Sequence, residues 1–223
     1  MVPRFCRGVD AISHFFHRVA SWCGLLLALL TVEQVVARYI FNRPSVALQE
    51  LEWHLFGAIF LLGTAWTLRA DGHVRVDIFY ARASARCRAL IDLLGLIFLL
   101  IPCCLIIAWH GWQYAVKARA YESGVEPDRL SAALAGKDGA FYPLLARSER
   151  LLRQTVLVGE ISPDPGGLEA RWLAKALVPL GFLLLALQGL ALAFHKIALL
   201  RGLEAPETPQ PPPEARHPPL EAP

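Results

Sequence analysis

The chain has 223 residues, of which 55% are hydrophobic, and its mean hydropathy is +0.42. This composition leaves little polar sequence for an independent soluble domain, so one compact helical domain is predicted. The net charge is only +3, and the basic residues are spread along the chain, which argues against nucleic-acid binding. The five cysteines form no CxxC pair and have no histidine at zinc-finger spacing, so neither a disulfide framework nor a structural zinc site is expected.

Four apolar segments divide the chain. Each approaches the ~20 residues that a helix rising ~1.5 Å per residue needs to cross a ~30 Å hydrocarbon layer. A helix satisfies its own backbone groups where water is absent, so it is the expected spanning form. The sequence therefore predicts an all-α integral membrane protein with four transmembrane helices and short amphipathic interfacial helices. The four spans are Ala20–Ile40, Leu51–Leu68, Leu90–Val116 and Trp172–Leu199.

Residues 1–19 are predicted to form a cytoplasmic or interfacial amphipathic segment. Arg4 and Arg7 precede an apolar run as in a secretory signal, but no clear small-residue cleavage site follows, which favours a retained signal anchor. Apolar residues such as Phe5 and Phe15 alternate with polar ones such as Asp10. A short helix in the membrane interface and a simple extension of the first span both fit this pattern.

The orientation follows from lysine and arginine placement. The connection Arg69–Arg88 carries five arginines, whereas the first connection holds only Arg38 and Arg43, so Arg69–Arg88 is predicted to be cytoplasmic. Both termini then lie in the cytoplasm. The connection of about residues 117–171 has eight basic and eight acidic residues and is placed in the periplasm. Leucines spaced along residues 144–157 predict an amphipathic helix there, either covering apolar surface or binding a partner.

Two segments near the carboxyl end break helical structure. The turn-rich stretch of residues 162–167 stops any helix before the fourth span. Eight of the sixteen prolines fall in the last 22 residues, so residues 201–223 are predicted to be a disordered cytoplasmic tail.

Ionisable residues beside the spans are the functional candidates, because such groups are expensive near hydrocarbon and need partners or water. Arg38, Glu50 and Glu52 are predicted near the outer face, and His73 and Asp77 near the cytoplasmic face. The plainer interpretation is that the outer residues occupy the headgroup layer and that the inner ones pair with nearby arginines or face water.

Several motifs together resemble a known family. They are Arg38-Tyr39-Ile40-Phe41-Asn42, Gln49-Glu50-Leu51-Glu52-Trp53-His54-Leu55-Phe56, Gly63, Gly72-His73-Val74-Arg75-Val76-Asp77, and Ser162 to Leu168 followed by Arg171-Trp172. Their order and spacing are similar to the small membrane subunit of tripartite ATP-independent periplasmic (TRAP) transporters, the DctQ-like family, over most of Arg38–Ala191. The stretch Arg119–Glu160 is longer than expected for that family, and the proline-rich tail has no counterpart in it.

The resemblance implies a four-span subunit of the bacterial inner membrane with both termini cytoplasmic. It implies two protein partners, namely a larger many-span TRAP membrane subunit and a periplasmic solute-binding protein that delivers an organic acid. The ion gradient, typically of sodium, would act through the large subunit. Arg38, Glu50, Glu52, His73 and Asp77 become candidates for fixing the bundle or the joint between subunits.

The residues themselves favour an accessory role. No internal repeat is seen, the middle of each span is nearly all apolar, and no nucleophile, carboxylate pair or metal cluster lies at depth. We therefore expect no enzymatic activity, cofactor or metal. The alternative is a four-span b-type cytochrome with His54 and His110 as haem ligands, both predicted near the outer face. A four-span scaffold unrelated to transport is a third interpretation.

Overall fold

The computed structural model describes residues 4–70, 84–121, 147–148, 151–152 and 155–202. Within these residues all regular structure is helical, and four helical spans are long and apolar enough to cross a membrane. The predicted fold class of a four-span helical membrane protein is confirmed. The helices are α1 (Arg4–Tyr39), α2 (Val46–Arg69), α4 (Ala85–Leu94), the π-helix η1 (Gly95–Leu100), α5 (Ile101–Arg119) and α8 (Trp172–Leu200).

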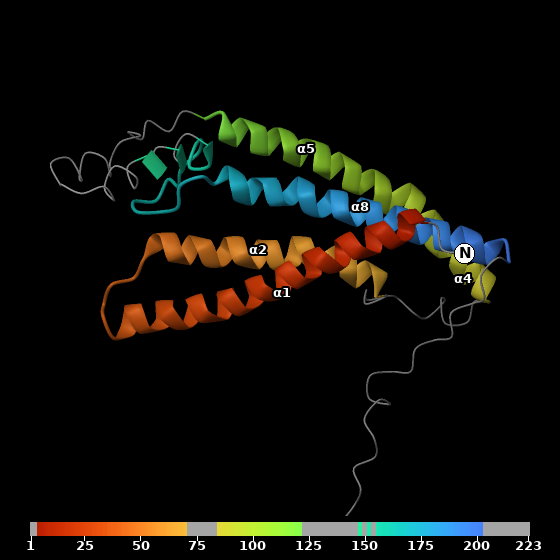
Figure 1. Ribbon diagram of the computed structural model, residues 1–223, viewed down its shortest axis with the longest axis horizontal. Helices are drawn as coiled ribbons and strands as arrows, with labels where there is room; N and C mark the ends of the chain where they lie inside the picture. Colours follow the sequence, from red (N-terminus) through yellow and green to blue (C-terminus); the bar gives the residue numbers. More distant parts are fainter. Residues whose placement is uncertain (1–3, 71–83, 122–146, 149–150, 153–154, 203–223) are drawn as a thin grey trace, which may run out of the picture.

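Successive spans run in opposite directions along the long axis of the molecule (Figure 1). α1 and α2 form a hairpin, α5 and α8 lie side by side, and α2 also packs against α8. The amino-terminal half of α1 crosses to α8. We call the end of the bundle that holds residues 40–45 and 155–171 the loop end, and the end that holds Arg4 and Leu200 the terminus end.

The first span is much longer than the sequence predicted. α1 is one helix of 36 residues that starts at Arg4, with no break near Val19 or Ala20. Residues 4–19 thus continue the helix of the first span, as in the second of the two alternatives, and their place relative to the membrane stays a prediction. The extension is possible because its polar residues find partners on α2 and α8. The Asp10 carboxylate, for example, lies 3.0 Å from the guanidinium of Arg69.

Small residues dominate the contacts between helices. Most of the buried hydrophobic residues are alanines. A Cβ added at Gly181 of α8 would lie 2.9 Å from the carbonyl oxygen of Leu61 in α2, and one at Gly111 of α5 would lie 3.1 Å from the ring of Pro179. In lipid, helices associate through close packing because apolar side chains gain little by leaving the hydrocarbon. These glycines and alanines therefore set how closely the spans approach.

The third span contains a π-helical turn. Pro102, in the first turn of α5, has no backbone N–H, so the regular bonding pattern cannot continue through it. The preceding six residues, Gly95–Leu100, are π-helical, and the N–H of Ile101 donates to the carbonyl of Leu96. Such local adjustments re-satisfy backbone groups around a proline within a membrane span.

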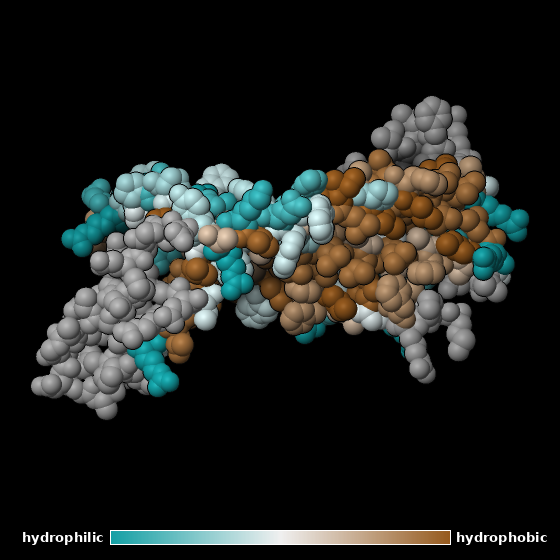
Figure 2. All heavy atoms as spheres, turned by 90° about the horizontal axis from the view of Figure 1, so that it is seen from above, coloured by the Kyte–Doolittle hydropathy of each residue, from teal (hydrophilic) through white to brown (hydrophobic). Residues whose placement is uncertain are grey.

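Large hydrophobic side chains remain exposed along all four spans, among them Leu29, Phe60, Phe98 and Phe194. Figure 2 shows a broad hydrophobic surface over much of the bundle, with hydrophilic residues gathered at the loop end and a smaller group at the opposite end. This distribution is the one expected when lipid or another membrane helix surrounds the middle of the bundle and water meets its ends.

Candidate functional site

The loop end is organised around the carboxylate of Glu50, in the second turn of α2. Its Oε1 accepts a hydrogen bond from the hydroxyl of Ser162, and its Oε2 accepts one from the backbone N–H of Leu168 at 2.7 Å. α2 starts where it does because the side chain of Ser45 caps it and accepts from the N–H of Leu48. Glu50 thus joins the start of the second span to the segment that leads into the fourth.

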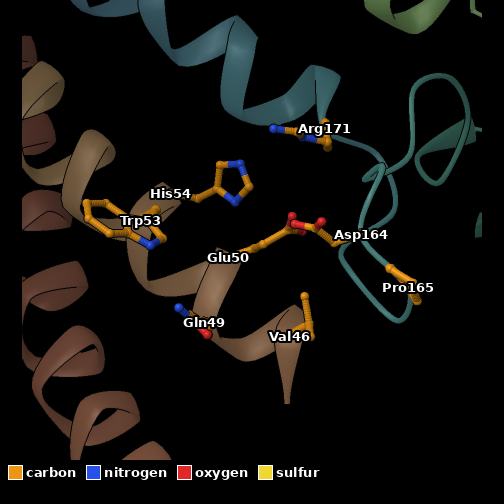
Figure 3. A pocket seen from close by; sticks show the side chains of 8 residues that line it. All are labelled: Val46, Gln49, Glu50, Trp53, His54, Asp164, Pro165 and Arg171. Atoms are coloured by element: carbon orange, nitrogen blue, oxygen red, sulfur yellow. The ribbon is translucent and has the colours of Figure 1, made fainter. Parts of the chain in front are cut away.

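A hollow of about 540 Å³ opens beside this carboxylate. In Figure 3 the His54 imidazole and the Arg171 guanidinium lie above Glu50, whereas the side chain of Gln49 points away from the loop. The hollow is lined by α2 on one side and by residues 164–171 on the other. Its lining residues are Val46, Gln49, Glu50, Trp53, His54, Asp164, Pro165 and Arg171.

The segment that leads into α8 folds back on itself. The N–H of Ser162 donates to the carbonyl of Leu168 (3.0 Å), and the N–H of Asp164 donates to the Ser162 hydroxyl (3.2 Å). Gly167 comes so close to Ser162 that an added Cβ would overlap its side chain. The two prolines and two glycines in residues 163–167 thus form a compact turn that brings the Ser162 hydroxyl and the Leu168 N–H to Glu50.

The same segment is tied to α5 and α8. Glu160 donates its N–H to the carbonyl of Ala118 (2.8 Å), and its carboxylate pairs with Lys175 of α8. The ammonium of Lys175 also lies 4.0 Å from the ring centroid of Tyr114 in α5. Gly159 has a φ of +92°, and a Cβ there would lie 2.5 Å from the Ala118 carbonyl oxygen. Hydrogen bonds and an ion pair therefore join α2, α5 and α8 at the loop end.

A second polar network lies at the terminus end, inside the bundle. Gln188 of α8 and Ser13 of α1 are each 1% exposed, and the Ser13 hydroxyl donates to the Gln188 Oε1 at 2.7 Å. The amide of Gln188 donates to Asp10 at 3.1 Å, and Asp10 pairs with Arg69 at the end of α2. The guanidinium of Arg69 lies 5.0 Å from the ring of Trp66. No local pattern in the sequence indicates this network, because Ser13 and Gln188 are 175 positions apart.

The predicted site residues have different outcomes. Glu50 is at the centre of the loop-end junction. Arg38 is exposed in the last turn of α1, and no described residue forms a hydrogen bond or ion pair with it. Glu52 is partly buried, and its Oε1 has no hydrogen-bond partner among the described residues. His73 and Asp77 lie outside the described residues.

Ser162, Leu168 and Arg171 are the partners that the sequence did not assign to Glu50. The turn-forming residues 162–167 and the cation at position 171 can be recognised in the sequence. Nothing in the sequence indicates that they face Glu50, which is 112 positions before Ser162. A carboxylate at the start of a membrane span, which needs donors, was the only available signal.

At both the loop end and the terminus end, the polar side chains form hydrogen bonds and ion pairs that join the helices. Across the described part of the chain, no group of three or more histidine, cysteine or acidic residues is placed to hold a metal ion. His54 lines the hollow together with Glu50 and Arg171, and His110 is not among the lining residues. The b-type cytochrome alternative has no support. The fold and its polar ends define a four-span membrane protein with an apolar middle.

Comparison with known proteins gives a more specific assignment. Residues 27–132 match the family described as "Tripartite ATP-independent periplasmic transporters, DctQ component". The chain is also similar to the C4-dicarboxylate TRAP transporter small permease protein DctQ of Vibrio cholerae serotype O1, with 29% identity over 119 residues. The aligned region covers 50% of this chain and 48% of that protein. The chain thus spans about half the length of this relative. These matches confirm the resemblance to the DctQ-like small TRAP subunits.

No solved structure matches the chain.

Proposed function

We propose that this protein is the small permease subunit of a TRAP-type secondary transporter. It would scaffold the large transport subunit during ion-gradient-driven uptake of an organic acid that a periplasmic binding protein delivers. The match of residues 27–132 to the DctQ component carries this proposal. The four spans that the structure describes have a nearly all-apolar middle, which supports it, because a translocation path needs polar groups or unwound backbone at depth.

We propose that the loop end faces the periplasm and that both termini are cytoplasmic, in the bacterial inner membrane. The charged residues support this orientation, since Arg69, Arg86, Arg88, Lys196 and Arg201 lie toward the terminus end, where α2 and α8 end and α4 begins. Cationic residues are enriched on the cytoplasmic side of membrane proteins. The loop-end hollow beside Glu50 is then available to help dock the binding protein.

The five candidate residues belong to the same proposal. Glu50 fixes the loop end, and Arg38 and Glu52 are available for contacts with the large subunit near the periplasmic face. His73 and Asp77 are candidates for the cytoplasmic side of the joint. We propose no catalytic, cofactor or metal role for any of them.

Deleting the chain tests the function. The large subunit and the binding protein are reconstituted in vesicles under a sodium gradient, with and without this chain, and organic-acid uptake is measured. We expect uptake only with all three proteins, and the chain should co-purify with the large subunit. Full uptake by the other two proteins alone would contradict the scaffold role.

A further inference from the structure

One acidic residue lies apart from both polar ends. Within residues 20–37, 55–68, 93–116 and 176–194, which make up the apolar middles of the four spans, Glu33 is the only charged residue. It is exposed on α1. The one hydrogen bond described for it is a long contact of 3.3 Å from the neutral amide of Gln34, its neighbour in sequence.

The position of Glu33 along α1 places it below the membrane surface. Trp22 and Tyr39 are 67% and 76% exposed on α1, and such aromatic residues sit at the two interfaces of a bilayer. The 17 steps along the helix from Trp22 to Tyr39 correspond to ~26 Å, close to the thickness of the hydrocarbon layer. Glu33 is six residues from Tyr39, or ~9 Å inside that boundary.

The face of α1 that holds Glu33 is apolar and exposed. Residues three, four and seven positions away share its face of the helix. Those residues include Leu26, Leu29 and Val36, which are 46%, 60% and 37% exposed. A carboxylate in the middle of such a stripe is costly unless a cation or a donor covers it. None of the described residues pairs with Glu33 as a cation.

We infer that the α1 stripe formed by Leu26, Leu29, Glu33 and Val36 is the surface that binds the large subunit. The occupant is a transmembrane helix that places a lysine or arginine opposite Glu33. Helices in lipid associate by packing and by interhelical polar contacts, and this stripe offers both. A symmetric contact with a second copy would bring Glu33 against Glu33, and like charges repel. This inference rests on the proposed function.

Photocrosslinking from matched positions tests the surface. A photoreactive phenylalanine is placed at Leu29 or, as the control, at Ile106 of α5, two sites with 60% and 59% exposure. The chain is expressed in membranes together with its large subunit. We expect a crosslink to the large subunit from Leu29 and none from Ile106. A Leu29 crosslink only to lipid or to a second copy of the chain would overturn the inference.

Charge reversal tests the partner's chemistry. We expect E33K to lower co-purification of the large subunit roughly tenfold, and E33Q to lower it less, because the amide still accepts a hydrogen bond. An acidic substitution of the large-subunit cation should restore binding to E33K. Unchanged co-purification of E33K would overturn the inference while the proposed function stands. Failure of the unaltered chain to co-purify would overturn both.

Discussion

At the scale of single residues, Glu50 is the side chain on which the loop end depends. One carboxylate satisfies a hydroxyl and a backbone N–H from a segment more than a hundred residues away. Hydrogen bonds to an ionised acceptor are stronger than neutral ones, and removing the acceptor leaves the donors unpaired. This explains why a turn rich in proline and glycine holds a defined shape.

The variant E50Q should loosen the loop end. Glutamine has one acceptor oxygen in place of two and no charge, so one of the two donors loses its partner. We expect the free energy of unfolding in detergent micelles to fall by about 1–3 kcal/mol. The cleavage by trypsin after Arg171 should also become faster.

The control for this change is Q49A. Gln49 lines the same hollow, but its side chain points away from the loop (Figure 3). Q49A should unfold like the unaltered protein, and trypsin should cleave it after Arg171 at the same rate as the unaltered protein. Equal stability of E50Q and Q49A would show that Glu50 does not hold the loop.

At the scale of helices, the glycines of α8 fix the distances between spans. Gly181 touches the backbone of Leu61, whereas Gly63 on α2 has nothing within 4 Å of an added Cβ. The two positions therefore form a natural pair for testing helix packing.

The variant G181A should force α2 and α8 apart, because its Cβ would lie 2.9 Å from a carbonyl oxygen that cannot rotate away. Overpacking of this kind costs about 1–3 kcal/mol, so we expect unfolding at a lower denaturant concentration in mixed micelles. The matched variant G63A should be neutral or slightly stabilising, since alanine is the better helix former. Loss of stability in G63A alone would contradict the packing described here.

The sequence predicted the four spans well and their ends less well. The bilayer sets the length of an apolar helix, so the hydropathy of Leu51–Leu68 and Trp172–Leu199 was sufficient to locate α2 and α8. α2 starts earlier than predicted because Ser45 caps it. The start of α1 was ambiguous because an aspartate at position 10 argues against a buried helix unless it has partners, and its partners Arg69 and Gln188 are distant in the sequence.

The candidate site was only partly predictable. Glu50 could be selected because a carboxylate beside hydrocarbon needs donors. Its partners Ser162 and Leu168, and the buried pair Ser13 and Gln188, depend on contacts over more than 100 positions, which no local pattern encodes. A proline at position 102 predicts an interruption of the third span, but it does not specify the π-helical form that Gly95–Leu100 adopt before it.

At the scale of the whole molecule, the proposed orientation is open to a direct test. In a background without native cysteines, S84C lies at the start of α4 and S148C lies in the connection before α8. We expect an impermeant thiol reagent to label S148C in intact cells and S84C only after the membrane is opened. The reverse pattern would show that the subunit is inserted the other way round.

The polar contacts at both ends also determine how the subunit responds to the bilayer around it. α1 and α8 have 36 and 29 residues, about 54 and 44 Å of helix, and so extend through the headgroup layers of a membrane about 40–45 Å thick. Spans joined at both ends cannot slide past one another to match a thinner or thicker bilayer. Hydrophobic mismatch must then be relieved by tilting the bundle as one body or by deforming the lipid, and a change in membrane thickness would reorient the α1 surface that we propose binds the large subunit.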